Sequence, residues 1–422
     1  MGHSFDEVRG RLDRHEVFAG LSGTPYYQDA VYERFSAAEM ARRLAATREL
    51  MGRRGVEALI VPGGPSHWSA GAGMRWLTDH REWHAMACYV VVPMQGEPTL
   101  VYSMGGTHCE ATRRAVAVAD VRPSRNGRFA EVMVDRLKEL GLDQARIGIT
   151  ECDPRFHDYL PINQYATLRM GLPQATFEFL GGFFHELMVA KSPEEQACVR
   201  KAGALCVAAL EAVMRRAAPG ATDEHLAAAA NAAILEGGGE LDFVILGSTP
   251  MASPAMVFGN PRPSGRALRK GDIILNELAA GYRGYSAQVG VPICVGEPPP
   301  EVRRFFDEVA RPGFEALEAT LRPGAPLDSI REAGQFFRKQ GVQSRPLVLH
   351  GIDLVTAPPF VGVDRIEAEP YERTLRPGMT LMLEPNPITP DGMFGMFTGH
   401  TYLIGGDGAE RVTPFPMELP VV

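Results

Sequence analysis

The sequence predicts an α/β N-terminal domain followed by an α+β C-terminal domain. In the first 180 residues, β-branched runs bounded by glycine and proline alternate with segments whose apolar residues recur at helical spacing. Two long helical segments follow, and then a strand-rich region, an order that is typical of an α+β domain. We therefore expect two domains, at residues 1–184 and 185–422.

The composition is that of an ordinary globular protein and excludes several classes of function. Hydrophobic residues make up 45% of the 422 and charged residues 22%. The net charge of −8 and the absence of a Lys/Arg-rich run argue against a nucleic-acid partner. No apolar run reaches the roughly 18 residues of a membrane helix, and the charged N-terminus does not resemble a signal peptide. Six scattered cysteines without a CxxC pair indicate reduced thiols, so we expect a cytoplasmic protein.

The elements of the first domain follow from local signals. Residues 36–56 begin with a capping serine and continue with helical periodicity. The segments 57–64 and 85–104 are β-branched runs broken by turns, which predicts strands. Residues 129–150 and 158–180 each predict a helix followed by a strand.

The second domain is predicted to open with two helices between residues 184 and 238. Ser192 is placed as N-cap with Pro193 in the first helical position, and Pro219 and Gly220 separate the two helices. Strands dominate after residue 240, with a helical interlude at 299–340.

One predicted hairpin carries an acid where apolar residues are expected. In "GDIILNELAAGY", Glu277 is flanked by apolar residues, and the returning strand "GYSAQVGVPICVG" carries Gln288 eleven positions later. A buried carboxylate costs several kcal/mol unless it is paired or ligates something. A functional cleft is therefore one interpretation, and a solvent-facing position on an edge strand is the other.

Three further polar residues end or interrupt apolar strands in the same domain. They are His350 in "RPLVLHGIDL", Glu384 in "LRPGMTLMLEPNP" and His400 in "GHTYLIGG". Each histidine, taken alone, fits a hydrogen-bonded core residue. Together with Glu277 they form the convergent polar set that is typical of an active-site cleft.

Five segments, in order, resemble those of the pita-bread-fold family, which contains methionine aminopeptidase, aminopeptidase P, prolidase and creatinase. They are "MVAKSPEEQACVRKAG", "LRKGDIILNELAAGYRGYSAQ", "LHGIDL", "LRPGMTLMLEPNP" and "GHTYLIGGDGAERVT". The fourth is the most specific, because it matches the family's Leu-x-Pro-Gly-Met pattern with Glu-Pro after four further residues. The resemblance implies a creatinase-like two-domain architecture with a pita-bread C-terminal domain.

The resemblance also implies where metal ligands would lie. The family's peptidases hold two divalent metals with two Asp, one His and two Glu. These positions fall on Glu277, Gln288, His350, Glu384 and Gly399. Gln288 is a poor ligand and Gly399 offers none, so too few carboxylates remain to offset about four positive charges. We expect no metal or other cofactor, with a single divalent ion on Glu277, His350 and Glu384 as the alternative.

Creatinase is the family's metal-free precedent, but the match to it is incomplete. Its catalytic histidine lies in a His-Asn-Pro segment, and Gly259 precedes Asn260 and Pro261 here. Gly290 falls where creatinase has a glutamate on the returning strand. The resemblance therefore favours a creatinase-like non-peptidase member with another substrate.

An aromatic segment of the N-terminal domain is a second candidate binding element. All three tryptophans lie between residues 66 and 92, together with several histidines. Members of this family often form homodimers in which the partner's N-domain closes the site, so we expect Trp68 and His84 to contact substrate. A packed subunit interface explains the cluster equally well.

These observations predict a metal-independent hydrolase of a C–N bond in a small non-peptide molecule, such as a creatine- or ectoine-like amide, amidine or guanidino compound. His350 would transfer the proton, and Glu384 would orient the His350 ring or balance its charge. Glu277 would bind a cationic group or act as base or nucleophile. The predicted pocket-lining residues are Gln288, Tyr282, Tyr285 and His400. Two alternatives stay open: a lyase that uses the same groups, and a catalytically silent protein that binds a ligand or partner.

Overall fold

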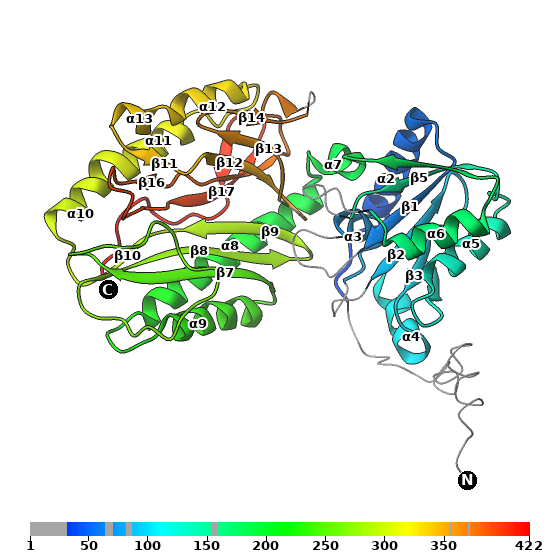
Figure 1. Cartoon of the computed structure of the whole chain (residues 1–422), viewed down its shortest axis with the longest axis horizontal. Helices are drawn as coiled ribbons and strands as arrows, with labels where there is room; N and C mark the ends of the chain where they lie inside the picture. Colours follow the sequence, from blue (N-terminus) through cyan, green and yellow to red (C-terminus); the bar gives the residue numbers. More distant parts are fainter. Residues whose placement is uncertain (1–31, 64–70, 82–86, 153–158, 355, 370–371) are drawn as a thin grey trace, which may run out of the picture. The chain divides into compact units, whose positions relative to one another are not determined.

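The computed structural model describes residues 32–63, 71–81, 87–152, 159–354, 356–369 and 372–422 (Figure 1). The chain divides into two compact units, Met1–Leu187 and Met188–Val422. The first is an α/β unit and the second an α+β unit, as the sequence predicts.

The first unit is built on a mixed six-stranded sheet in the order β4-β3-β2-β1-β5-β6. Its strands are β1 (Ala58–Gly63), β2 (Cys88–Pro93), β3 (Thr99–Tyr102), β4 (Asp120–Pro123), β5 (Arg146–Thr150) and β6 (Thr176–Leu180). The helices of this part are α2 (Ala37–Arg54), α3 (Ala72–Thr78), α4 (Gly106–Ala115), α5 (Phe129–Glu139), α6 (Ile162–Gly171) and α7 (Phe183–Met188). β1 is antiparallel to β2 and parallel to β5, so crossover helices are required, as in other α/β sheets.

The second unit is built on a ten-stranded sheet whose main path runs β10-β8-β9-β17-β15-β12-β13-β14, with β7 beside β8 and β18 beside β17. Its strands are β7 (Glu240–Pro250), β8 (Asp272–Tyr282), β9 (Tyr285–Gly290), β10 (Ile293–Val295), β12 (Leu347–Ile352), β13 (Thr356–Gly362), β14 (Ile366–Glu367), β15 (Thr380–Leu383), β17 (Gly399–Ile404) and β18 (Ala409–Arg411). β11 (Gln343–Ser344) and β16 (Pro387–Ile388) form a separate two-stranded sheet.

The helices of the second unit are α8 (Pro193–Arg216), α9 (Asp223–Glu236), α10 (Pro300–Phe305), the π-helix η2 (Phe306–Ala310), α11 (Arg311–Glu318), α12 (Leu327–Gly334) and α13 (Phe336–Lys339). α8, α9 and α11 to α13 pack against one face of the large sheet, whereas α10 and η2 pack with Ile273 and Leu275, which point to the other face of β8. Figure 1 shows α8 and α9 beside β7, β8 and β9, and α11 to α13 beside β12 and β13. The two predicted helices and the helical interlude are thus present.

The start of α8 fits its sequence. Ser192 accepts a hydrogen bond from the backbone N–H of Glu195, and the Glu195 carboxylate accepts one from the backbone N–H of Ser192. This capping box satisfies two of the donors that every helix start leaves open. The predicted N-cap is therefore confirmed.

Strand alternation decides which side chains the helices bury. In β8, Ile274, Leu278 and Ala280 pack in the core cluster formed with α8 and α9. Further along the sheet, Leu349 of β12 and Leu383 of β15 pack with residues of α11 to α13. Successive side chains of a strand point to opposite faces, so the residues between these positions point away from α8, α9 and α11 to α13.

Candidate functional site

Glu277 and Gln288 lie on the face of the sheet opposite α8 and α9. Glu277 precedes the helix-facing Leu278, and Ala279 pairs directly with Gln288 across the hairpin. Residues two apart on a strand share a face, so Glu277, Ala279 and Gln288 lie on the same side. Glu277 is 5% exposed and Gln288 2% exposed.

His350 and Glu384 belong to the same face. His350 of β12 pairs with Met382 of β15, and both alternate with helix-facing leucines. Glu384 follows Met382 by two positions, at the end of β15. The structure therefore places Glu277, Gln288, His350 and Glu384 on one face of the sheet, with His350 and Glu277 both close enough to Glu384 to interact with it.

Glu384 is the centre of the charged group. Its Oε2 lies 3.7 Å from His350 Nε2, and its Oε1 lies 3.9 Å from Arg345 Nη1. Glu384 and His350 are both buried. A buried carboxylate is tolerated because cationic or polar groups compensate for its lost hydration, and Arg345 supplies that compensation here.

The imidazole of His350 has a defined orientation. Its Nδ1 lies 2.9 Å from the carbonyl oxygen of Gly351. A carbonyl only accepts hydrogen bonds, so Nδ1 carries a proton and donates it. In the neutral imidazole the lone pair is then on Nε2, the atom nearest to Glu384.

Glu277 is the acid most strongly altered by its surroundings. Burial raises the pKa of Glu277 well above its usual range, the negative charge of Glu384 raises this pKa further, and Arg345 opposes the rise. Two neighbouring acids in environments of this kind can supply one proton donor and one carboxylate.

Gln288 presents an unused acceptor in the site. Its side-chain Oε1 is buried and has no hydrogen-bond partner among the described residues. A buried carbonyl oxygen without a donor costs roughly 1–3 kcal/mol. A bound molecule or water that donates to Gln288 would remove this cost.

Two apolar side chains fill the space in front of Gly399. A Cβ atom at this position would lie 2.4 Å from Cε of Met382 and 3.1 Å from Cε1 and Cζ of Phe397. A Cβ at Gly290, the residue paired with Gly399, would lie 2.3 Å from Cε1 of Phe397. The volume that a fifth ligand side chain would need is thus occupied by Met382 and Phe397.

We therefore expect Gly399→Glu to destabilise the protein by about 3 kcal/mol, because the side chain must displace two packed groups and bury a carboxylate. Chemical denaturation of the variant measures the loss. Gly406→Glu is the matched control, since Gly406 has open space around it. Met382→Ala in the Gly399→Glu background should recover part of the stability, and equal stability of Gly399→Glu and wild type would contradict this account of the packing.

His400 was predicted to line the pocket, and this prediction is wrong. It pairs with the helix-facing Val289, and its ring packs edge-on against Phe314 of α11 at a centroid distance of 5.6 Å. Burial, and to a lesser extent the charge of Arg411, lower the pKa of His400 to about 3, and the bond to Thr413 opposes the change. The family resemblance places Gly399 at a site position, and the next residue of a strand necessarily faces the other way.

Tyr282 and Tyr285 also lie on the helix side, contrary to the prediction. The hydroxyl group of Tyr285 donates a hydrogen bond of 2.5 Å to Glu195 of α8. The ammonium group of Lys201, also in α8, lies 6.0 Å from the centroid of the Tyr282 ring. Both tyrosines therefore help to attach α8 to the hairpin and do not contact the acids.

The predicted contacts of Trp68 and His84 lie outside the described residues. Two other members of that aromatic segment are described, and both pack within the first unit. Trp76 is 1% exposed and lies edge-on to Phe184, while His80 lies edge-on to Tyr102.

Arg345 is the residue of the site that the sequence analysis missed. It lies in a short segment between β11 and β12, where an arginine is ordinarily solvated, and no pattern distinguishes it. Its guanidinium lies 3.9 Å from Glu384 and 5.1 Å from the centroid of the Phe258 ring. The structure thus adds a cation and an aromatic ring to the predicted set.

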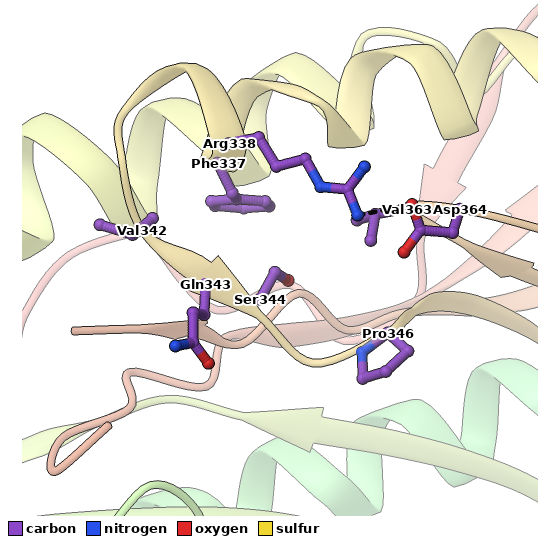
Figure 2. Close-up of a pocket in the computed structure, with 8 residues that line it drawn as sticks. All are labelled: Phe337, Arg338, Val342, Gln343, Ser344, Pro346, Val363 and Asp364. Atoms are coloured by element: carbon purple, nitrogen blue, oxygen red, sulfur yellow. Dashed lines mark ion pairs between the residues drawn. The ribbon is translucent and has the colours of Figure 1, made fainter. Parts of the chain in front are cut away.

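A separate cavity of about 280 Å³ lies beside α13, and Figure 2 shows its lining. Its wall includes Ser344 and Pro346, and an ion pair joins Arg338 to Asp364 across it. Arg345, between Ser344 and Pro346 in the chain, is not part of this lining. The cavity therefore does not contain the acids of the site.

The donor set does not fit a dinuclear metal centre. Within the described ranges, no three His, Cys, Asp or Glu side chains are arranged to hold a metal ion. Of the five implied ligand positions, Gln288 is an amide and Gly399 has no side chain. Hard divalent cations in pairs require several carboxylates, which this face does not supply.

The fold and the site define a two-domain protein of the creatinase and metallopeptidase type. Residues 43–187 match the profile of the "Creatinase/Prolidase N-terminal domain", and residues 197–405 match that of "Metallopeptidase family M24". The chain belongs to the pita-bread-fold family that these two domains characterise.

Relatives match along nearly the whole chain. A "Probable dipeptidase PepE" of Mycobacterium tuberculosis is 28% identical over 416 residues, which is 92% of this chain and 98% of the relative. The "Ectoine hydrolase" of Halomonas elongata is 23% identical over 419 residues, or 91% of this chain and 98% of that protein. The X-Pro aminopeptidase of Thermotoga maritima has a TM-score of 0.75 at 17% identity, with 90% of this chain and 99% of that chain covered.

These relatives support an enzyme of the hydrolase class. In the part of the chain that the structure describes, no helix is both long enough and apolar enough to cross a membrane.

Proposed function

We propose that the chain hydrolyses a C–N bond in a small non-peptide molecule, without a dinuclear metal centre. The observation that carries this proposal is the apolar filling of the space at Gly399 by Met382 and Phe397, beside two acids and a histidine. A metal-dependent peptidase needs carboxylates where this protein has an amide and a glycine. Acid–base chemistry by Glu277, His350 and Glu384 does not need carboxylates at those two positions.

The geometry supports a division of labour among three residues. The lone pair on Nε2 of His350 takes a proton from water while the water oxygen attacks the carbon of the C–N bond. Glu277, kept protonated by its raised pKa, gives its proton to the departing nitrogen as the C–N bond breaks. Glu384, 3.7 Å from Nε2, stabilises the imidazolium that forms. The proton then passes from His350 to Glu277 and restores both groups.

Two candidate substrate classes follow from the relatives. The ectoine hydrolase supports a small cyclic or acyclic amidine or amide as the substrate. The name of that relative gives a substrate that is not a peptide, and the match covers 91% of this chain. The PepE relatives, at 28% identity, favour a dipeptide as the second candidate. Substrates of both classes contain a C–N bond next to polar groups. An assay that finds turnover of one class and not of the other distinguishes the two candidates.

Purified protein with its metal content measured should therefore keep its full kcat/KM after treatment with 1,10-phenanthroline. His350→Ala should lower kcat by roughly 10²- to 10⁴-fold, the usual contribution of a general base. The assay uses ectoine, guanidinoacetate, N-acetylglycine and glycylglycine as substrates. His108→Ala, in α4 of the first unit, is the control and should keep wild-type activity.

Two results would overturn the proposal. One is loss of activity on chelation that Mn²⁺, Co²⁺ or Zn²⁺ restores, which would also establish the single-ion alternative. The other is full activity of His350→Ala. We further propose a cytoplasmic homodimer, and light scattering of the purified protein tests the dimer.

A further inference from the structure

The guanidinium of Arg345 is a cation with unused donors. Among the described residues, no side chain or backbone group accepts a hydrogen bond from it, and its Nη1 is both buried and unpartnered. Glu384 lies 3.9 Å away, which is close enough for charge compensation but too long for a hydrogen bond. The side chain is 39% exposed, so its accessible surface lies on the atoms other than Nη1.

The backbone and neighbours of Arg345 hold this side chain in place. Its backbone N–H donates to the carbonyl oxygen of Asn386, which follows Glu384 by two positions. Its guanidinium lies 5.1 Å from the centroid of the Phe258 ring. Packing against an aromatic ring restricts the side chain of Arg345 before binding. Less side-chain entropy is then lost when the guanidinium binds an anion.

The charge of Arg345 already compensates Glu384, so it is the unused N–H donors of the guanidinium that favour an acceptor such as a carboxylate at this position. Glu277 and Glu384 offer a negative or hydrogen-bonding surface to the nitrogen end of a substrate, and Arg345 is the cation of the described residues that lies beside them. An arginine fork binds a carboxylate through two parallel N–H···O bonds, which fixes both position and orientation.

We propose that Arg345 binds the carboxylate of a zwitterionic substrate whose C–N bond lies against Glu277 and Glu384. This assignment rests on the proposed C–N hydrolase function and narrows its substrate class to small amino-acid-like molecules that carry both a carboxylate and an amide, amidine or guanidino group. Arg345 is then a specificity-determining residue, and Glu277, His350 and Glu384 perform the chemistry.

Matched pairs of compounds test the assignment by calorimetric titration and by kinetics. The pairs are N-acetylglycine with N-acetylglycinamide, and guanidinoacetate with guanidinoacetamide. The carboxylates should bind wild type more tightly than their neutral partners by about 10- to 100-fold, the range for hydrogen bonds to a charged group. Arg345→Gln should abolish that difference, and Arg345→Lys should retain only part of it, because lysine keeps the charge without the fork.

Arg338→Gln is the matched control, since Arg338 is an exposed arginine that pairs with Asp364 outside the site. It should leave both the affinities and KM unchanged. For any compound that is turned over, Arg345→Gln should raise KM for carboxylates with a smaller change in kcat.

The outcomes separate this inference from the proposed function. Turnover of neutral and anionic partners with equal KM overturns the role of Arg345 and leaves the hydrolase intact. Binding of carboxylates that depends on Arg345, without turnover of any compound, supports the subsite and refutes the hydrolase. Failure of every carboxylate to bind wild type, or equal binding to wild type and Arg345→Gln, also overturns the assignment.

Discussion

Replacement of Glu277 by glutamine should make the protein more stable and far less active. The raised pKa means that the folded protein binds a proton at Glu277 that the unfolded chain releases above about pH 4.5. Wild-type stability therefore falls as the pH rises from that value to the folded pKa, by about 1.4 kcal/mol per pH unit. Glutamine keeps the shape but never ionises, so the variant does not share this loss.

The stability gain of Glu277→Gln should accordingly be near zero at pH 4, grow with pH, and level off above the folded pKa. Urea denaturation across this range measures it. Turnover should fall by roughly 10²- to 10⁴-fold, since glutamine cannot protonate the leaving nitrogen. Glu410→Gln is the control, because Glu410 is an exposed partner of Arg200. A stability difference that does not change with pH would contradict the raised pKa.

The second large effect is expected at Lys191, whose ammonium group lies 2.8 Å from the Asp353 carboxylate in a pair that is 3% exposed on each side. The pair joins the segment before α8 to the end of β12, three residues after His350. Lys191→Met removes the positive charge from a buried carboxylate, and such losses cost about 3–5 kcal/mol. We expect a decrease of that size in the free energy of unfolding.

The positions of the tryptophans help to locate the effect of Lys191→Met. Trp68, Trp76 and Trp83 all belong to the first unit, so tryptophan emission reports that unit. Far-UV circular dichroism also reports α8 and α9 of the second unit. The variant should shift the dichroism transition and leave the emission transition nearer to its wild-type position. Lys191→Met with Asp353→Asn should recover most of the loss, and the proposal fails if the single variant unfolds like wild type.

Much of the fold could be predicted because local signals agree with the tertiary structure. Ser192 and Pro193 define the start of α8, and the apolar runs around Glu277 and Glu384 define two neighbouring strands. The spacing of Glu277 and Gln288 also predicts a shared face, because the tight hairpin places Gln288 opposite Ala279, which is two residues from Glu277 on the same strand.

The positions of the other site residues could not be predicted, because they depend on tertiary contacts that the local sequence pattern of a strand does not contain. Successive residues of a strand face opposite sides, so His400, the neighbour of Gly399, points to the helix side and not into the site where it was predicted. Tyr285 was predicted to line the pocket, but its hydrogen bond to Glu195, ninety positions away, cannot be read from the sequence. Arg345 was missed for the same reason, since its proximity to Glu384 arises only when β11 and β12 are in place.

The filling of the space at Gly399 bears on how this protein can change over evolutionary time. Converting the site toward a dinuclear peptidase would require an acid at Gly399, a smaller residue at Met382 or Phe397, and an acid at Gln288. The first step alone creates a clash, and the second alone leaves a void. Each single substitution of this kind is thus expected to lower the free energy of unfolding until the others are present. Epistasis of this kind would require several substitutions at once before a dinuclear site could form in this fold.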